Sequence, residues 1–306
     1  MKKTIKFILG AVVVILLFIT VSILNVTKNE AHKLITAPIE THSLPEKTPA
    51  SYGMPFENVT VTSPDGLRLA GWFIPSQNGA VIMMQHGYKS DREELLNEAE
   101  MMYRHGYSIL LTTVRAHDAS EGERITFGMQ EVQDMEAWYQ YLLTREGVDP
   151  DKIGILGNSY GGMLAIQYAA QNKNIKAVVA DSAFSSLSDT VSTSVTYFTD
   201  LPAFPFAPLI VFWAERETGF KMEDIDATKW IAKISPRPVF LMQGGADVVI
   251  SADSGQRLYD AAGEPKELWY DPALGHVDFD RDRAAEFEQR VAGFFDTYLP
   301  GIEIGD

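Results

Sequence analysis

The sequence contains no cysteine among its 306 residues. Disulfide bonds, thiolate metal ligands and a cysteine nucleophile are therefore all excluded. A chain without cysteine can fold in an oxidising or a reducing compartment, so this absence assigns no compartment.

Positive charge is also scarce. Lysine and arginine number 26 against 41 aspartate and glutamate residues, which gives a formal net charge of -15 at pH 7. This excess of negative charge repels nucleic acid, and no basic stripe with interleaved aromatics is present, so we expect no nucleic-acid partner. The H-E-x-x-H, P-loop and dinucleotide-binding motifs are missing as well. The sequence therefore predicts neither a metal site nor an organic cofactor.

The longest apolar stretch lies at the N-terminus, where three lysines among the first six residues precede a run from Phe7 to Val26. A spanning helix needs about 20 mostly apolar residues, whereas the core of a cleaved signal peptide is shorter, about 7–15 residues. The motif Thr20-Val21-Ser22 is a poor cleavage site and lies inside the run. We expect residues 1–27 to be a transmembrane anchor, with a cleaved signal segment as the alternative.

Charge on the two sides of this segment predicts its orientation. Positive charge clusters before it, while Lys28, Glu30 and Lys33 after it are mixed in sign. The positive-inside rule then puts the N-terminus in the cytoplasm and the rest of the chain outside, in a single-pass protein of the cell membrane. If the segment is cleaved, the protein is secreted. Residues 28–55 are polar and contain four prolines, which predicts a linker.

Residues 56–300 are expected to form one domain. An alternating hairpin opens it, and short apolar runs then alternate with segments of helical periodicity. This pattern predicts an α/β fold with a mostly parallel central sheet, an antiparallel hairpin at its N-terminal edge, and helices on both faces. Residues 184–235 break the alternation with prolines and aromatics. We expect a small cap over the sheet there, with an ordinary crossover helix as the alternative.

The segment Gly157-Asn158-Ser159-Tyr160-Gly161 lies where a buried strand is expected to give way to a helix. A serine hydroxyl becomes a nucleophile only when a base removes its proton and the backbone exposes its oxygen. A sharp strand-to-helix turn provides that exposure, and it requires small residues two positions before and after the serine. Ser159 is the predicted nucleophile. A glycine-rich turn with an idle serine is the alternative.

Chain order identifies the expected partners of this serine. His276 is the only histidine after Ser159, and it lies in a loop before the last predicted helix. Asp247 follows the predicted strand at 238–243, and an acid between serine and histidine matches the order of the strand–turn–helix arrangement. We expect His276 to be the base and Asp247 the acid that orients it, with Asp181 as the rival acid.

An acyl-transfer site also needs donors for the developing oxyanion. The backbone N–H of Tyr160 follows the nucleophile, and the loop after the strand at 80–85 offers the backbone N–H of Tyr88. We expect these two groups to form the oxyanion hole. The side chain of His86 is expected to brace the loop.

The ordered motifs at 86–87, 157–161, 244–250 and 275–276 form a recognisable set. On these motifs, the chain from about Met54 to Leu299 resembles the α/β-hydrolase superfamily, and it is most similar to the bacterial branch of serine aminopeptidase-like and prolyl-oligopeptidase-like hydrolases. The resemblance implies an α/β-hydrolase fold and acyl transfer to water through a covalent acyl-enzyme.

A carboxylic ester is the leading expected substrate, taken up in an apolar pocket under the cap. A peptidase or amidase on the same three residues is the alternative. Such an enzyme needs an anchor for the substrate's amine, for which the cap offers Glu215, Glu217, Glu223 and Asp224. A surface-tethered binding protein that has lost catalysis is a third hypothesis, because fold alone does not guarantee activity.

One motif departs from the pattern of the resembling family. That family often has R-G-H-G-x-S-x-G in the loop after its fourth strand, and here the loop reads R-A-H-D-A-S-E-G from Arg115 to Gly122. Both inner glycines are replaced, which predicts a stiffer loop. We expect His117 in this loop to be a structural residue beneath the site.

Overall fold

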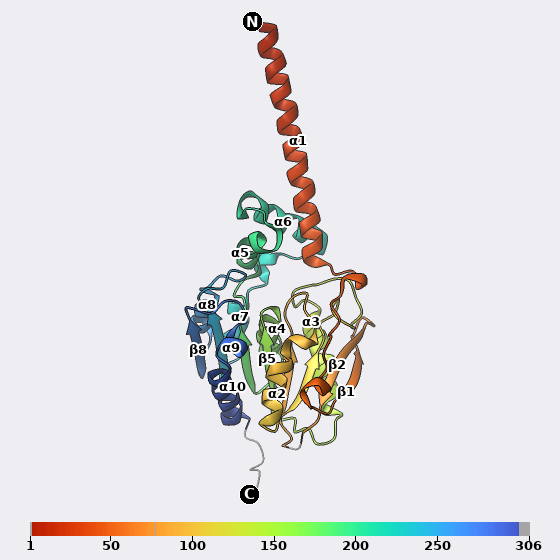
Figure 1. The fold of residues 1–306 in the computed structure, drawn as a ribbon, viewed down its shortest axis with the longest axis vertical. Helices are drawn as coiled ribbons and strands as arrows, with labels where there is room; N and C mark the ends of the chain where they lie inside the picture. The colour runs from red at the N-terminus through yellow and green to blue at the C-terminus, as the bar shows by residue number, and fades with distance from the viewer. Residues whose placement is uncertain (1, 77, 300–306) are drawn as a thin grey trace.

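A computed structural model describes residues 2–76 and 78–299 of the chain (Figure 1). Met1 and Pro300, the outer limits of two of the predicted segments, lie outside the described residues.

Eight strands form one sheet in the order β1-β2-β4-β3-β5-β6-β7-β8. The first pairings, β1 with β2 and β2 with β4, are antiparallel, and all the others are parallel. This arrangement confirms the predicted fold class. The strands are β1 (Glu57–Thr62), β2 (Arg68–Ile74), β3 (Val81–Gln85), β4 (Ser108–Thr112), β5 (Ile153–Asn158), β6 (Ala177–Asp181), β7 (Val239–Gly244) and β8 (Lys266–Asp271).

Two hydrophobic cores cover the two faces of the sheet. Because successive strand residues point to opposite faces, Val81 and Met83 of β3 join one core, while Ile82 and Met84 join the other. The first core packs against α3 (Glu131–Leu143), α4 (Tyr160–Gln171), α7 (Ala227–Ile231) and α8 (Ser254–Ala261). The second packs against α2 (Leu96–Arg104), α9 (Phe279–Asp282) and α10 (Ala284–Tyr298).

The insertion at 184–235 is only partly a cap. Its helices α5 (Leu187–Thr199) and α6 (Ala203–Thr218) stand over the end of the sheet nearest the long N-terminal helix (Figure 1). Helix α7, in contrast, packs against α4 in the layer that covers the sheet. Its Ala227 and Ile231 are buried there, so the cap proper is shorter than the predicted segment.

The N-terminal helix is longer than the predicted anchor. Helix α1 runs over Lys2–Ile35, eight residues beyond the expected end at position 27. No proline interrupts the sequence before Pro38, and Ala31 and Ile35 are buried one helical turn apart. These last turns pack against α6.

The remainder of the predicted linker also packs against the domain. The Ala37 N–H donates to the Glu123 carbonyl at 2.9 Å, and Ala37 itself is buried. Residues of the predicted linker at 28–55 therefore pack against the domain, whereas a linker was expected to hold the domain away from the membrane. The division into three segments stays a prediction.

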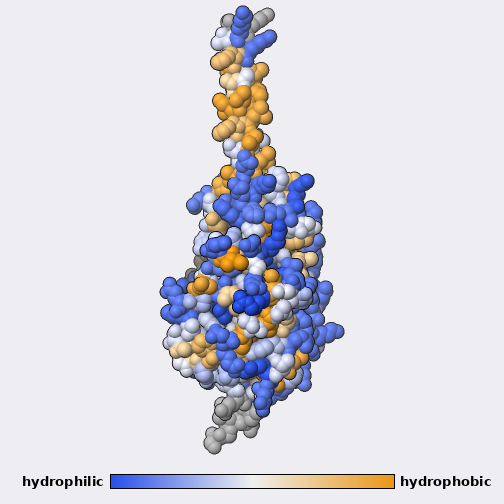
Figure 2. Space-filling view, turned by 90° about the vertical axis from the view of Figure 1, so that its right-hand side faces the viewer, coloured by the Kyte–Doolittle hydropathy of each residue, from blue (hydrophilic) through white to orange (hydrophobic). Residues whose placement is uncertain are grey.

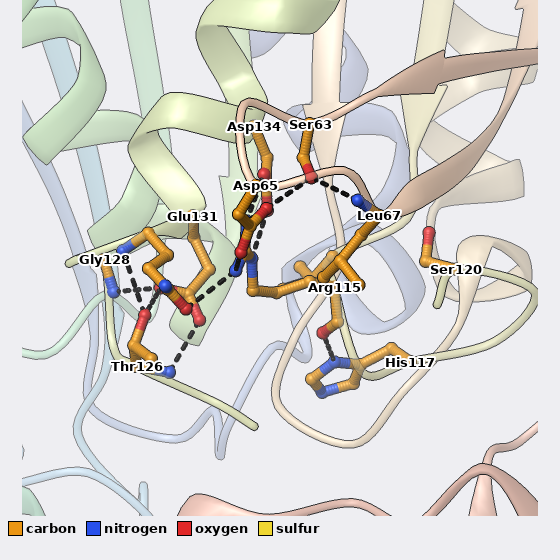
Figure 3. Close-up of polar contacts among 12 residues, drawn as sticks. Ser63, Asp65, Leu67, Arg115, His117, Ser120, Thr126, Gly128, Glu131 and Asp134 are labelled. Carbon is orange, nitrogen blue, oxygen red and sulfur yellow. Dashed lines mark hydrogen bonds and ion pairs between the residues drawn. The ribbon is translucent and has the colours of Figure 1, made fainter. Parts of the chain in front are cut away.

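A buried arginine fixes the loop after β4 (Figure 3). The Arg115 guanidinium donates to both carboxylate oxygens of Asp134 at 2.6 Å, and also to Asp65 at 2.8 Å and Gln130 at 2.7 Å. Glu131, one turn before Asp134 in α3, accepts backbone N–H groups from the adjoining 126–128 turn (Figure 3). One cation therefore ties this loop to the β1–β2 turn and to α3.

The two replaced glycine positions keep a backbone that glycine favours. Ala116 has φ 59° and Asp118 has φ 45°, a region that ordinary residues seldom occupy. The Asp118 carboxylate is held by Arg92 at 2.6 Å and by the Thr113 hydroxyl at 3.1 Å. Side-chain bonds thus maintain a conformation for which glycine would need no support.

Replacing the buried cation should be costly. We expect Arg115→Met to lower the free energy of unfolding by about 3–5 kcal/mol, because it leaves the buried Asp134 carboxylate without its partner. Urea unfolding measures the change. Arg68→Met is the matched control, since the Arg68–Glu121 pair is exposed and should contribute less than about 1 kcal/mol. Equal losses in the two variants would contradict a structural role for Arg115.

Candidate active site

Ser159 lies at a strained bend between β5 and α4. Its backbone has φ 55° and ψ -116°, which is rare for a residue with a side chain. A Cβ at Gly157 would overlap the backbone of Gly161, and a Cβ at Gly161 would overlap the Gln85 carbonyl. Glycine is therefore required on both sides of the bend, as the sequence spacing predicts.

The three residues predicted to act together come into contact at this bend. Nε2 of His276 lies 2.8 Å from Oγ of Ser159, and Nδ1 lies 2.7 Å from Oδ2 of Asp247. The other carboxylate oxygen of Asp247 accepts the backbone N–H groups of Val249 at 2.8 Å and Ile250 at 2.9 Å. With Nδ1 protonated and bonded to this buried carboxylate, Nε2 is an acceptor directed at the serine hydroxyl.

Asp181, the rival acid, occupies a different place. Its backbone carbonyl accepts the Ser159 N–H at 2.7 Å, and its carboxylate accepts the Ser182 hydroxyl at 2.8 Å. Among the described residues, no hydrogen bond or ion pair joins this carboxylate to His276. Burial raises the pKa of Asp181 to about 7.

Two backbone N–H groups remain available beside Ser159. In the turn after β3, the Gly87 N–H donates to Glu94 at 3.1 Å and the Lys89 N–H donates to Nε2 of His117 at 2.9 Å. Within the part of the chain that the structure describes, the N–H groups of Tyr88 and Tyr160 have no partner. These are the two donors that the sequence predicts for an oxyanion.

Two buried, neutral histidines support the turn that carries Tyr88. Nε2 of His86 accepts the Val114 N–H at 3.1 Å, and Nδ1 of His117 donates to the Arg115 carbonyl at 2.8 Å. Burial lowers the pKa of both imidazoles, that of His117 to about 3. Each ring can therefore accept a backbone N–H through its unprotonated nitrogen.

Two buried acids near the serine, Glu94 and Glu98, were not predicted from the sequence. Glu94 binds the Gly87 N–H, and Glu98 accepts the Asn158 side-chain amide at 2.9 Å. Burial raises the pKa of both carboxyls. Their spacing of four residues, typical of two side chains on one helical face, was the available signal.

A cavity of about 590 Å³ opens above Ser159 and His276. Its apolar walls come from the cap, the last turns of α1, the turn that carries Tyr88, the 126–128 turn and the loop after β7. The apolar lining includes Leu34, Phe127, Phe184, Leu187, Val191, Val195, Phe198 and Ile210. Among the described residues, no three His, Asp or Glu side chains gather as a metal site would require.

Acid should weaken the fold through His117. Its pKa is about 3 in the folded chain and about 6.5 when unfolded. Between these values the unfolded chain binds a proton that the folded chain does not, so stability is lost as the pH falls below about 6.5. His117→Gln keeps an acceptor for Lys89 but does not titrate.

We therefore expect the unfolding free energy of the unmodified chain to fall more steeply with acidification than that of His117→Gln, by up to about 1.4 kcal/mol per pH unit. Urea titrations at a series of pH values measure both slopes. Parallel slopes would show that His117 is not held neutral.

Comparison with known proteins agrees with this architecture. The family model for X-Pro dipeptidyl-peptidase (S15 family) matches residues 65–201. The uncharacterized protein YfhR of Escherichia coli K12 is 27% identical over 248 residues, which cover 78% of this chain and 80% of that protein.

Solved structures give the same result. The esterase Pf2001 of Pyrococcus furiosus superposes with a TM-score of 0.73 at 25% identity, over 87% of this chain and 98% of that one. The acylaminoacyl peptidase of Pyrococcus horikoshii shares the fold, with a TM-score of 0.64 at 17% identity over 83% of this chain and 43% of that one. With the sheet order and the bend at Ser159, these matches make the chain a member of the α/β-hydrolase superfamily and a hydrolase of its peptidase–esterase type.

Proposed function

We propose that this hydrolase cleaves carboxylic esters, with Ser159 as nucleophile, His276 as general base and acid, and Asp247 as the residue that orients the imidazole. The observation that carries the proposal is the continuous hydrogen-bonded chain from Asp247 through His276 to Ser159. It lies at the floor of a largely apolar cavity. Such a chain provides a deprotonated serine at the moment of attack.

The reaction follows from these contacts. Ser159 Oγ attacks the ester carbonyl while Nε2 of His276 takes the hydroxyl proton, and the N–H groups of Tyr88 and Tyr160 receive the oxyanion. Collapse breaks the bond to the alcohol, which leaves with the proton from His276, and the acyl group stays on Ser159. Water then attacks the acyl-enzyme by the same route, releasing the acid and restoring the serine.

The surroundings of the cavity favour an ester over an amide. The cap carboxylates considered for an amine anchor point elsewhere: Glu215 pairs with Lys221 at 2.7 Å and Glu217 with His32 at 2.8 Å. None of the four candidate acids lines the described part of the cavity. An acyl chain, in contrast, meets apolar walls from the cap.

One observation keeps amide cleavage as a second candidate. Glu98 and Asp280 line the cavity near Ser159, and Oε2 of Glu98 is buried without a hydrogen-bond partner in the described chain. A substrate ammonium group beside these acids would meet an acceptor. Turnover of aminoacyl amides above that of plain esters would support this candidate.

We further propose that α1 anchors the protein in the cell membrane, with its N-terminus in the cytoplasm and the hydrolase domain outside. The helix is long and apolar enough to cross a membrane, and the apolar window is not buried by the rest of the chain. Figure 2 shows this helix as an apolar column between polar residues at its tip and the polar domain. A cleaved signal segment has the same composition as an anchor. The two differ in whether the mature protein keeps residues 1–27, which tests the anchor.

A panel of nitrophenyl esters of graded acyl length tests the proposed reaction. We expect the full chain in detergent to hydrolyse them and to prefer medium or longer chains, because the cavity is apolar. Ser159→Ala should lower kcat by about 10⁵–10⁶-fold. Ester hydrolysis no greater than in this control would refute the proposed function.

Matched substitutions distinguish the two acids. We expect Asp247→Asn to lower kcat by about 10³–10⁴-fold, because the amide favours the wrong imidazole tautomer. Asp181→Asn should stay within a few-fold of the unmodified enzyme, because the Asp181 carboxylate does not contact His276. Circular dichroism establishes that both variants fold, and equal losses of kcat in the two would contradict the assignment.

A further inference from the structure

The cap exposes an unusually apolar surface. Between Thr190 and Ala214 the only charged residue is Asp200. Four aromatic side chains on this stretch face outward, with exposed fractions of 58% for Tyr197, 58% for Phe198, 83% for Phe204 and 46% for Phe212. Exposed apolar side chains gathered on one segment of a folded protein indicate a binding surface.

The cap lies alongside α1 in a defined register. Lys28 lies over the Trp213 ring at 6.0 Å, and four residues further along both helices His32 pairs with Glu217 at 2.8 Å. Helices α1 and α6 therefore run in the same direction. The backbone of Phe204 is not helical (φ -104°, ψ 133°), so regular helix begins at Pro205. At about 1.5 Å per residue, Pro205 lies roughly 12 Å from Trp213, towards the N-terminus of α1.

Burial along α1 agrees with this register. Residues 3–21 are exposed, whereas Ser22 and Ile23 are half-buried. Both belong to the apolar run that ends at Val26. If that run fills a hydrocarbon core of about 30 Å, Ser22 lies about 6 Å inside its boundary. Helix α6 packs against α1, so the half-burial of Ser22 and Ile23 places the N-terminal part of the cap near this level.

The cavity opens at this end of the molecule. Its lining includes Lys33 and Leu34 of α1 and Tyr197 and Phe198 of α5. Phe198 both lines the cavity and is largely exposed. An acyl chain can therefore pass from the cap surface to Ser159 along apolar side chains.

We propose that the tip of the cap inserts into the same bilayer that α1 spans, and that the substrate is an ester lipid entering the cavity from that bilayer. This inference rests on the proposed anchor and on the proposed esterase function. The net charge of -15 disfavours attraction to anionic headgroups, so insertion depends on apolar contact and zwitterionic lipid suffices. Interfacial helices insert in this way to a depth of about 5–10 Å.

A single-cysteine label measures the depth of the cap directly, since the chain has no cysteine of its own. In the full chain, the cysteine introduced by Phe204→Cys is labelled with an environment-sensitive fluorophore. The labelled protein is then reconstituted in phosphatidylcholine vesicles with bromine-labelled acyl chains. The matched control is Leu143→Cys, an exposed apolar residue. Leu143 lies near Arg145, which pairs with Glu57 at the amino ends of the parallel strands.

We expect lipid bromines to quench the label at 204 strongly and the label at 143 weakly, with little effect of salt. Iodide in the aqueous phase should quench the label at 143 strongly and the label at 204 weakly. Equal access of iodide to both labels would overturn the inference. Quenching at 204 that grows with the protein-to-lipid ratio would overturn it too, because it would indicate contact between copies of the chain.

Turnover tests the substrate class. Phe204 does not line the described cavity, so we expect Phe204→Asp to hydrolyse a water-soluble short-chain nitrophenyl ester within about twofold of the unmodified chain and to lose about tenfold on a long-chain acylglycerol in phosphatidylcholine vesicles. Leu143→Asp should change neither rate.

The two readouts separate the two proposals. Absence of soluble-ester hydrolysis in the unmodified chain would refute the esterase function itself. Hydrolysis of the soluble ester with lipid turnover that is unaffected by Phe204→Asp would refute only the entry of substrate from the bilayer.

Discussion

The bend at Ser159 is the constraint on which the rest of the site depends. A positive φ at this residue is unfavourable in isolation, and it is maintained because β5 and α4 are each packed into a core of the domain. The bend brings the serine oxygen to the carboxyl edge of the parallel strands, where the loops after β7 and β8 begin. Asp247 and His276 can therefore reach one point although 88 residues separate Ser159 from Asp247.

A second set of contacts gives the other half of the site its shape. Arg115 fixes the loop after β4, its carbonyl binds His117, and His117 in turn holds the Lys89 peptide next to Tyr88. Each step is a buried or partly buried hydrogen bond whose loss would leave an unpaired polar group. The position of one proposed oxyanion donor thus depends on an arginine that lines no part of the described cavity.

Much of this architecture could be predicted from the sequence, because the signals are local. Apolar runs mark the strands, the glycines around Ser159 mark the bend, and chain order leaves His276 as the only downstream histidine. The features that were missed depend on tertiary contacts. Helix α1 extends to Ile35 because its last turns have α6 to pack against, and Ala116 adopts a glycine-like φ because neighbouring side chains hold the loop. A local sequence pattern does not indicate which distant residues will pack against a segment.

The unbroken course of α1 also determines what the proposed active site can reach. The helix ends on the turn that carries the proposed oxyanion donor, where its Leu34 carbonyl accepts the Tyr88 hydroxyl at 2.9 Å and its Lys33 carbonyl accepts the Lys89 ammonium at 2.8 Å. A flexible tether would let the domain sweep a wide volume of solvent. The proposed anchor, as a rigid stalk in a bilayer, would instead hold Ser159 at a fixed height above the membrane plane. Molecules confined to that plane would be sampled continuously, and molecules in bulk solution only by diffusion to it.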